Sequence, residues 1–380
     1  MQTVFVKTFI YADHAATTRL CDAAWTAMQP FLREEFGNPS SLHSWARRPR
    51  EAVREARTTI AACIGAEPEE IFFTSGGTEA DNWVIKGTDG GLMVSAYEHH
   101  AVLNAAHSEA GRGRDVVYVH PKVGNGGGYV MPEKLSKAWK DGVGLVSVMT
   151  ANNEIGTVNP IHLLSEFAHK RGALFHTDAV QAVGHIPIDV QEVGVDFLSA
   201  SAHKFNGPKG IGFLYMRKGL KLNSLIHGGQ QEFGLRAGTE NVASIVGMAS
   251  ALKFNCERLE QNARYLDNLA VQFKDGLERF ADVVYLGAGV CPQLPGFISV
   301  SFPGHSAEGL MHMLDLKGIA VSTGAACDSR NTQISHVLKA INASKAIAES
   351  TIRITLGPEN TRQDVDTILF ELKSLLRKTT

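Results

Sequence analysis

The residues of this chain best suited to chemistry are a lysine and an aspartate, each placed at the end of a short apolar run. Lys204 follows the strand-like run Val195-Asp-Phe-Leu-Ser-Ala200 and precedes a glycine- and proline-rich turn. Asp178 ends a second such run, 26 positions upstream. A lysine amine attacks an aldehyde when its pKa is lowered and its position is fixed. Taken alone, Lys204 would more often be an ordinary surface lysine, and Asp178 would be a helix cap about as often as a cofactor ligand.

Together, the two residues predict a site for pyridoxal 5'-phosphate (PLP). The Lys204 amine would hold the cofactor's aldehyde as a Schiff base. The Asp178 carboxylate would keep the ring nitrogen protonated, so that the ring withdraws electrons from a bound amino acid. Because each residue closes a strand-like run, both side chains are expected at one edge of a sheet.

A third segment, Thr74-Ser-Gly-Gly-Thr78, lies between a β-rich run and a helix-compatible stretch. Free N–H groups at a helix start, approached closely past glycines, bind phosphate. The segment does not match the GxxxxGK[ST] pattern of a nucleotide-binding loop. We therefore predict that Gly77 and Thr78 hold the cofactor phosphate. The side chains of Ser201, His203 and Thr239 are candidate further donors.

Nine motifs, these included, occur in an order that resembles one known family. In chain order they are Tyr11-Ala-Asp-His-Ala-Ala-Thr-Thr18, Phe36-Gly-Asn-Pro-Ser40, Thr74-Ser-Gly-Gly-Thr-Glu79, Glu98-His99, Asn152-Asn-Glu-Ile-Gly156, Asp178-Ala-Val-Gln181, Ser201-Ala-His-Lys204, Gly234-Leu-Arg-Ala-Gly-Thr239 and Ser322-Thr-Gly-Ala-Ala-Cys327. The chain resembles the cysteine desulfurases, which are fold-type I enzymes of the class V aminotransferase family. The form of the last motif resembles the NifS/IscS-type group rather than the SufS-type group.

This resemblance implies roles for further residues. His99 would stack on the pyridine ring and move protons, as a group that titrates near neutrality can. Gln181 and Asn153 would hydrogen-bond the ring hydroxyl and the substrate side of the cofactor. Arg353 would clamp the substrate carboxylate through its planar fork of donors, with Asn38 as its helper. On pattern alone, an arginine between two isoleucines would instead face solvent.

Cys327 decides the reaction that the resemblance implies. On sequence alone it is either a small buried residue or a reactive thiol in the polar segment 327–333. As a desulfurase residue, its thiolate would take sulfur from L-cysteine, leaving L-alanine and a persulfide that passes to a protein acceptor. Iron–sulfur cluster assembly, tRNA thiolation and DNA phosphorothioation remain open as destinations. Where the family has Ser-Ala-Cys-Thr, this chain has Ala-Ala-Cys-Asp. The side chains on both sides of the thiol therefore differ from the family pattern, and the contacts and reactivity of this segment do not follow from the resemblance.

Three other functions remain alternatives. A selenocysteine lyase or a class V aminotransferase would share Lys204 and Asp178 without needing the cysteine segment. A non-catalytic scaffold that docks sulfur acceptors would need none of the cofactor residues. Alanine and sulfide production from L-cysteine separates these functions, because a scaffold yields neither and an aminotransferase yields a keto acid.

The alternation of helical and strand-like runs predicts an α/β fold with a mainly parallel sheet. The strand-like runs include Leu92-Met-Val-Ser95, Asp115-Val-Val-Tyr-Val119 and Leu145-Val-Ser-Val-Met149. Residues 244–280 predict one long helix that bridges two domains, and Thr361-Arg-Gln-Asp364 predicts the capped start of the last helix.

The resemblance completes this architecture and implies an assembly. It implies a fold-type I large domain over residues 15–258, with a seven-stranded sheet. A smaller α/β domain would comprise residues 1–14 and 259–380 and carry the Cys327 segment. It also implies a homodimer in which Thr239 reaches the neighbour's cofactor phosphate.

Composition sets outer limits on the kind of protein. The net charge of −2 has mixed signs, so no basic surface for nucleic acid or membrane lipid is expected. No apolar run approaches the ~18 residues of a spanning helix, and residues 1–10 do not form a signal peptide and predict a strand. Five scattered cysteines without a C-x-x-C pair favour a reducing cytoplasm and argue against a disulfide framework or a metal site.

Overall fold

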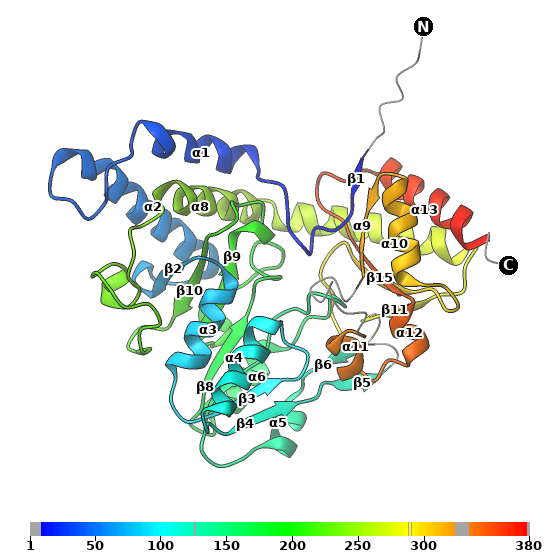
Figure 1. Ribbon diagram of the computed structural model, residues 1–380, viewed down its shortest axis with the longest axis horizontal. Coiled ribbons are helices and arrows are strands. Elements are labelled where there is room, and N and C mark those ends of the chain that lie inside the picture. The colour runs from blue at the N-terminus through cyan, green and yellow to red at the C-terminus, as the bar shows by residue number, and fades with distance from the viewer. Residues whose placement is uncertain (1–8, 125–126, 288, 290, 324–333, 378–380) are drawn as a thin grey trace, which may run out of the picture.

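The computed structural model describes residues 9–124, 127–287, 289, 291–323 and 334–377. Two α/β units lie side by side, one around a seven-stranded sheet and the other around a four-stranded sheet (Figure 1). Over the described ranges, no helix combines the length and apolar composition needed to cross a membrane. Within the same ranges, no group of three or more His, Cys, Asp or Glu side chains is placed to hold a metal ion.

The large sheet confirms the prediction of a mainly parallel, seven-stranded core. Its strands, in spatial order, are β2 (Ile71–Thr74), β10 (Gly212–Met216), β9 (Phe197–Ser201), β8 (Leu174–Asp178), β7 (Val143–Ser147), β3 (Gly91–Ser95) and β4 (Val116–Val119). Pairing is parallel from β9 through β4, whereas β10 runs antiparallel to both of its neighbours. β10 had no counterpart among the predicted strands.

Successive residues of the sheet enter different cores, which shows that both of its faces are covered. Phe73 and Leu198 belong to one apolar cluster, while their neighbours Phe72 and Phe197 belong to another. A sheet buried on both faces is the usual environment of parallel strands. The helices of the large unit are α1 (Asp22–Arg33), α2 (Arg47–Ile64), α3 (Gly77–Gly87), α4 (His100–Gly111), α5 (Pro132–Ala138), α6 (Ile161–His169), α7 (Val190–Val193) and α8 (Val242–Cys256), with 3-10 turns η1 (Ser44–Ala46), η2 (Pro68–Glu70), η3 (Ala202–Lys204) and η4 (Glu232–Gly234).

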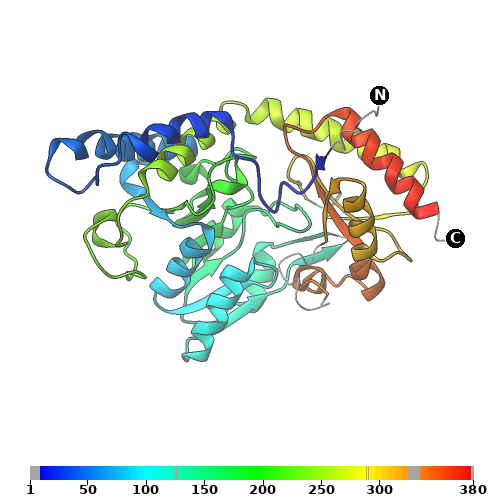
Figure 2. The same cartoon turned by 45° about the horizontal axis from the view of Figure 1, so that its top comes forward.

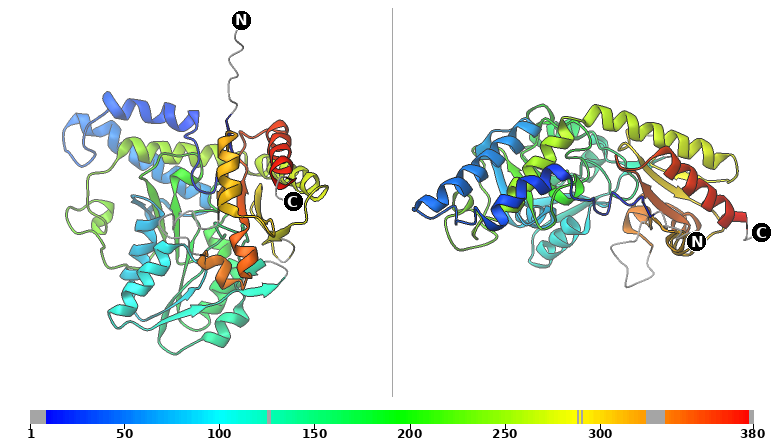
Figure 3. Two further views of the ribbon diagram at one scale, coloured as in Figure 1. Left: turned by 45° about the vertical axis from the view of Figure 1, so that its right-hand side comes forward. Right: turned by 90° about the horizontal axis from the view of Figure 1, so that it is seen from above.

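The small unit has its own apolar core. Its sheet comprises β11 (Val284–Leu286), β12 (Phe297–Ser301), β15 (Thr351–Thr355) and β14 (Ser322–Thr323), in that order. Its helices are α9 (Leu259–Glu278), α10 (Ala307–Leu316), α11 (His336–Ala340), α12 (Lys345–Glu349) and α13 (Arg362–Arg377). Helices α9 and α13 pack against each other beside this sheet (Figure 3). Ile10 and Ala12 belong to the same core, so the first described residues join the small unit.

Several local predictions meet the structure directly. The start of α13 is confirmed, because Thr361 N–H donates to Asp364 Oδ2 (2.8 Å) and Asp364 N–H donates to Thr361 Oγ1 (3.2 Å). The N-terminal strand is described only as β1 (Ile10–Tyr11), which pairs in parallel with β13 (Ile319–Ala320); residues 1–8 lie outside the described ranges. A short hairpin joins β5 (Lys122–Gly124) to β6 (Gly127–Tyr129).

The single long helix predicted over residues 244–280 was wrong, because the structure has two helices there. Arg258 leaves the helical region (φ −121°, ψ 5°), so α8 ends at Cys256 and α9 starts at Leu259. Neither glycine nor proline marks this break. The two helices still run from the large unit to the small one across one side of the molecule (Figures 1 and 2). The proposed domain boundary at residue 258 falls in this break and stays a prediction.

Candidate active site

A cavity of about 370 Å3 opens at the edge of the large sheet where β8 and β9 end. In sheets of this kind, ligands bind outside the carboxyl ends of the strands. The structure brings most of the predicted site residues to this cavity. Its lining includes Gly77, Thr78, His99, Asn153, Asp178, Gln181, Ser201, His203, Lys204 and Arg353, together with Ala15, Ala16, Asp81, Met149 and Val180.

Lys204 lies in the 3-10 turn η3, directly after β9. Its Nζ donates hydrogen bonds to the carbonyl oxygens of Ala15 and Ala16, the latter at 3.0 Å. Gln181 Nε2 donates to the same Ala15 oxygen at 2.9 Å. The segment at residues 15 and 16 therefore fixes both predicted cofactor residues at one side of the cavity.

Asp178 is the last residue of β8 and is buried. One carboxylate oxygen accepts from the Val180 N–H at 2.9 Å. Burial raises the Asp178 pKa to about 6, while the Val180 hydrogen bond and the Lys204 charge act in the opposite direction. A cationic ring nitrogen beside this carboxylate would favour its ionised form.

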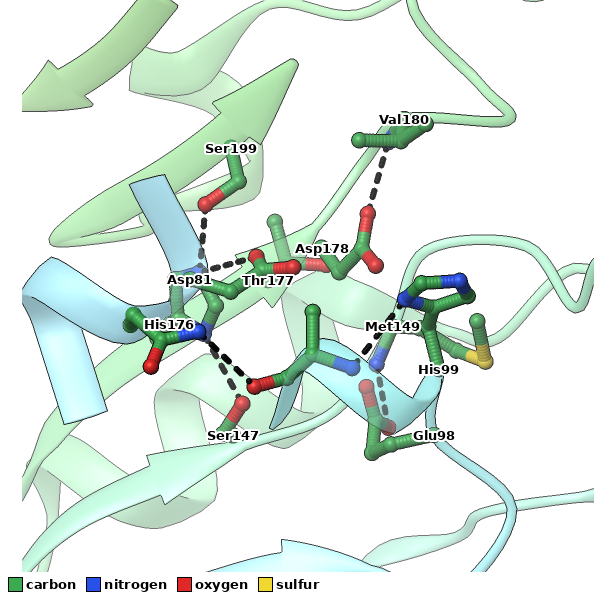
Figure 4. A network of polar contacts seen from close by, with 12 residues as sticks. Asp81, Glu98, His99, Ser147, Met149, His176, Thr177, Asp178, Val180 and Ser199 are labelled. Atoms are coloured by element: carbon green, nitrogen blue, oxygen red, sulfur yellow. Dashed lines mark hydrogen bonds and ion pairs between the residues drawn. The ribbon is translucent and has the colours of Figure 1, made fainter. Parts of the chain in front are cut away.

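Behind Asp178 lies a buried polar network that the sequence prediction did not include (Figure 4). The His176 ring lies between two hydroxyls, with Nδ1 2.8 Å from Ser147 Oγ and Nε2 3.0 Å from Ser199 Oγ. Asp81 Oδ1 is 3.6 Å from the same Nε2. Burial, and then the charge of Asp178, raises the Asp81 pKa well above its ordinary value. Burial lowers the pKa of His176 to about 3, so its ring is neutral at physiological pH.

Two acidic residues of this region could have been recognised from spacing. Asp81 lies three residues after Thr78 on α3, and such residues share a helix face. Glu98 precedes His99 in one of the nine family motifs, but no role was predicted for Glu98. Its Oε1 accepts from the Met149 N–H at 2.7 Å and from the Ser95 hydroxyl. Burial raises the Glu98 pKa to about 8, so this side chain is largely protonated at neutral pH.

His99 is the N-cap of α4 as well as a lining residue. Its Nδ1 accepts from the Ala101 N–H at 3.1 Å, which assigns the ring proton of the neutral form to Nε2. Burial lowers its pKa to about 4, and the charges of Lys204 and His100 act in the same direction. His100 instead packs against the His336 ring, with 4.4 Å between ring centroids.

At the start of α3 the backbone lies close to the neighbouring loop, as a phosphate-binding site at a helix N-terminus requires. A Cβ at Gly77 would lie 2.5 Å from Val180 Cγ2, so no side chain fits between α3 and this loop. Gly77 and Thr78 are the first two residues of the helix, where the N–H groups have no partner within the helix. Ser201 and His203 line the same cavity, and His203 Nδ1 is 3.1 Å from Thr17 Oγ1.

Arg353 reaches the cavity from β15 of the small unit and is only 4% exposed. The alternative of a solvent-facing arginine is therefore wrong. Its Nη2 contacts Asp13 Oδ1 at 2.7 Å, and its Nη1 donates to the Asn153 carbonyl oxygen at 2.7 Å. Within the described part of the chain, Arg353 Nε and Asn153 Oδ1 are buried without hydrogen-bond partners. These two atoms are suited to a polar ligand.

Three predicted residues are not brought to the cavity by the described chain. Asn38 is exposed, and its Oδ1 accepts from the Ser40 N–H at 2.9 Å, within its own turn. Thr239 is exposed and does not line the cavity. Cys327 lies outside the described residues.

The groups that do line the cavity fit PLP. A lysine amine, a buried carboxylate and a helix start without side-chain bulk match the cofactor's aldehyde, ring nitrogen and phosphate. The sheet order and this strand-end cavity define a fold-type I enzyme.

Comparisons with known proteins identify the family. The family model for class-V aminotransferases matches residues 10–368. A protein named cysteine desulfurase IscS from Dictyoglomus turgidum is 46% identical over 380 residues, covering 98% of this chain and 96% of that protein. A solved NifS-like protein superposes with a TM-score of 0.90 at 37% identity, covering 98% of this chain and 100% of the other. A structure described as SspA in complex with cysteine superposes with a TM-score of 0.81 at 33% identity, covering 93% of this chain and 100% of the other.

The chain therefore belongs to the class-V aminotransferase family and, within it, to the cysteine desulfurases. This confirms the family and the fold class predicted from the ordered motifs. Enzymes of this family use PLP, and desulfurase activity implies a cysteine substrate and a sulfur acceptor.

Proposed function

We propose that this chain is a PLP-dependent cysteine desulfurase that converts L-cysteine to L-alanine and leaves the sulfur as a persulfide on Cys327. The observation that carries the proposal is the cavity at the ends of β8 and β9, where Lys204, Asp178 and Arg353 meet. A scaffold that only docks sulfur acceptors would not need a lysine, a buried carboxylate and a buried arginine around one cavity.

When bound, PLP supplies an aldehyde for amine exchange and an electron sink for the bonds broken in the amino acid. Lys204 would hold the cofactor through its amine, and the same amine is placed to take the proton from the substrate α-carbon. Asp178 faces the ring nitrogen and stabilises its positive charge. Gly77 and Thr78 would hold the phosphate with backbone N–H groups, and Ser201 and His203, which line the same cavity, would be further donors.

His99 and Gln181 orient the ring. The His99 Nε2–H is the free edge of the imidazole, because Nδ1 is engaged by the Ala101 N–H. A ring that is neutral at physiological pH can stack on the pyridine and still lend or accept a proton at Nε2. Gln181 hydrogen-bonds the ring hydroxyl, held in place through Ala15.

Arg353 binds the substrate carboxylate. A guanidinium has five N–H donors, and the bonds to Asp13 and to the Asn153 carbonyl leave Nε–H available. Asn153, whose side-chain oxygen is buried without a partner in the described chain, would hydrogen-bond the substrate side of the cofactor. Asn38 is proposed as the helper of Arg353, although the single chain leaves it outside the cavity.

The sulfur step balances without an external oxidant. The Cys327 thiolate attacks the sulfur of bound L-cysteine, forming an S–S bond as the C–S bond breaks. The electron pair of the broken bond stays with the β-carbon, which takes a proton and becomes the methyl group of L-alanine. The outer sulfur is then passed to a protein acceptor, for iron–sulfur cluster assembly, tRNA thiolation or DNA phosphorothioation.

We also propose that two copies associate, as the Thr239 motif implies. Large apolar side chains are exposed at one end of the large unit, on α1 and the segment that follows it. They are Trp25, Leu32, Phe36, Leu42 and Trp45, each at least half exposed in the single chain. Apolar exposure of this density is typical of a protein–protein interface. Thr239, exposed in one chain, would then reach the phosphate held by the other.

Purified protein loaded with PLP and given L-cysteine tests the proposed activity. We expect alanine and sulfide in the presence of a reductant, and without one a persulfide on Cys327, seen by intact-mass and peptide analysis. Cys327→Ser should bind PLP and cysteine but release no catalytic alanine. Cys291→Ser, an exchange at a cysteine away from the cavity, is the matched control and should remain active.

The other outcomes assign other functions. Alanine formation by Cys327→Ser at the wild-type rate would favour a lyase that releases sulfur directly. A keto acid in place of sulfide would indicate an aminotransferase. If no product forms at all, the non-catalytic scaffold is the remaining function. Light scattering checks the dimer, and mixing the Lys204→Ala and Thr239→Ala chains tests whether the sites are shared.

A further inference from the structure

Two cysteines that the proposed function does not use lie together on the helical side of the large unit. Cys63 is the penultimate residue of α2 (Arg47–Ile64), and Cys256 is the last residue of α8 (Val242–Cys256). The two helices pack against each other (Figure 1). The residues are 193 positions apart, yet Cys256 Sγ approaches the Cys63 carbonyl oxygen to 4.0 Å. Each thiol also shifts the pKa of the other.

The pair is open to small molecules. Both side chains are partly exposed as free thiols, and both line one groove of about 810 Å3. The charged groups along this groove are Lys253, Asp189, Glu192 and Glu257. The groove involves α2, α8 and the α7 region, so it is separate from the cavity that holds Lys204.

The two thiols are unequal. The hydrogen bond from Cys63 lowers the pKa of Cys256, although burial and Glu257 oppose the shift. The same contact, together with burial, raises the pKa of Cys63. The pair therefore shifts Cys256 towards the thiolate and Cys63 towards the thiol, which makes Cys256 the better candidate for the attacking group. This asymmetry is typical of an attacking thiol beside a resolving thiol.

We propose that Cys63 and Cys256 form a redox-active dithiol that reacts with low-molecular-weight disulfides. The Cys256 thiolate attacks one sulfur of the disulfide and releases one small thiol, which leaves a mixed disulfide on Cys256. Cys63 then attacks the Cys256 sulfur, loses its proton and releases the second small thiol. The two protein thiols are oxidised by two electrons in total, and the external disulfide is reduced to two thiols. The proposal does not depend on the desulfurase activity.

The bond would join α2 to the break between α8 and α9. Cys256 lies two residues before Arg258, where the chain passes from the large unit to the helix that packs in the small one. Closing a loop of this length removes much conformational freedom from the unfolded chain. We therefore expect the oxidised protein to melt at a higher temperature than the reduced protein.

Thiol mapping after exposure to L-cystine tests the proposal. A full-length Cys327→Ser background removes the thiol proposed to accept sulfur. After reduction and cystine treatment, and before alkylation, we expect a disulfide between the two cysteines to lower the mass by about 2 Da, for the two hydrogens lost. After alkylation, we expect a peptide pair linked through Cys63 and Cys256. In Cys63→Ser the mixed disulfide should be trapped on Cys256. In Cys256→Ser no adduct should form on Cys63 at a comparable rate.

Matched controls make each outcome decisive. Cys21→Ser and Cys291→Ser should leave the linked peptide pair unchanged. The proposal is overturned if Cys63 and Cys256 stay fully alkylated under excess cystine, or if the linked peptides join other cysteines. It also fails if, in the Cys327→Ser protein with both thiols present, cystine oxidises Cys63 and Cys256 no faster than it modifies Cys21. None of these readouts requires turnover, so a failed activity assay leaves this test intact.

Discussion

The active-site cavity has two walls that are built in different ways. One wall, here called the cofactor wall, consists of Gly77, Thr78, His99, Asp178 and Lys204, all from the large unit. The other, the substrate wall, is Arg353 with its partners Asp13 and Asn153. On the cofactor wall, Asp178 ends β8 and Lys204 lies in the turn directly after the adjacent strand β9, so the two residues are only 26 positions apart. On the substrate wall, Arg353 meets Asp13 across 340 positions and Asn153 across 200.

This difference assigns different tasks to the two units. The cofactor wall is built from strand ends and helix starts of the large unit, so all of its side chains within one chain come from that unit. The substrate wall depends on how the small unit lies against the large one, because Arg353 comes from β15. A change in the first wall should alter cofactor binding, whereas a change in the second should alter substrate affinity. The predictions below separate the two.

The largest effect is expected for Lys204→Ala. Loss of this amine removes both the covalent anchor and the proposed base, and general-base loss alone costs up to about 10^4-fold in rate. We expect no turnover above background and loss of the visible absorbance that depends on the lysine. Lys209→Ala, at an exposed position in the following turn, is the control. If the alanine variant at Lys209 rather than Lys204 lost the colour, the cofactor wall would be wrongly assigned.

Asp178→Asn should give the next largest effect. Asparagine keeps the size and can still accept from the Val180 N–H, but it has no charge to offer the ring nitrogen. Removing one preorganised electrostatic partner costs on the order of 10^2–10^3-fold in kcat. We expect the variant to bind PLP with a shifted absorbance band and a lower kcat, measured by alanine release. A kcat equal to that of the wild type would remove Asp178 from the cofactor wall.

Arg353→Lys should affect the substrate wall alone. Lysine retains a charge for Asp13 but loses the planar fork, and one charge-assisted pair contributes up to about 3 kcal/mol, or roughly 100-fold. We expect KM for L-cysteine to rise by about that factor, while the absorbance of bound PLP is unchanged. Arg264→Lys, at an exposed position on α9, is the control. A loss of cofactor with no change in KM would contradict the division between the walls.

The same division explains what could be predicted from sequence. Lys204 and Asp178 were predicted from short apolar runs, since a strand and the group that follows it are local in the chain. The roles of Gln181 and Arg353 rested on family motifs, because no local pattern shows that Arg353 faces a cavity. Asp81 was missed although its spacing from Thr78 on α3 indicates a shared helix face, whereas the contacts of His176 are with neighbouring strands and have no local signal. The break at Arg258 was missed because it carries neither glycine nor proline.

The smallest expected effect concerns proton binding by the cofactor wall, measured on the cofactor-free protein. Burial lowers the His99 pKa from 6.5 to about 4, so the folded chain binds this proton less readily than the unfolded chain. Above pH 6.5 neither state is protonated and His99 has no effect on the pH dependence. As pH falls from 6.5 towards 4, the unfolded state takes up the proton first, and the free energy of unfolding decreases. At pH 5 this amounts to about 2 kcal/mol.

His99→Asn isolates this contribution, because asparagine also caps helices and should accept from the Ala101 N–H in place of Nδ1. Relative to the wild type, the variant should gain stability as pH is lowered from 7 to 5, by up to that amount, in urea unfolding of the two apoproteins. His120→Asn measures what the same exchange does at an exposed position. A difference that stays constant from pH 7 to 5 would mean that His99 is not desolvated in the apoprotein. The cofactor wall would then be formed only when PLP binds, and the contrast between a preformed wall and one that depends on two units would disappear.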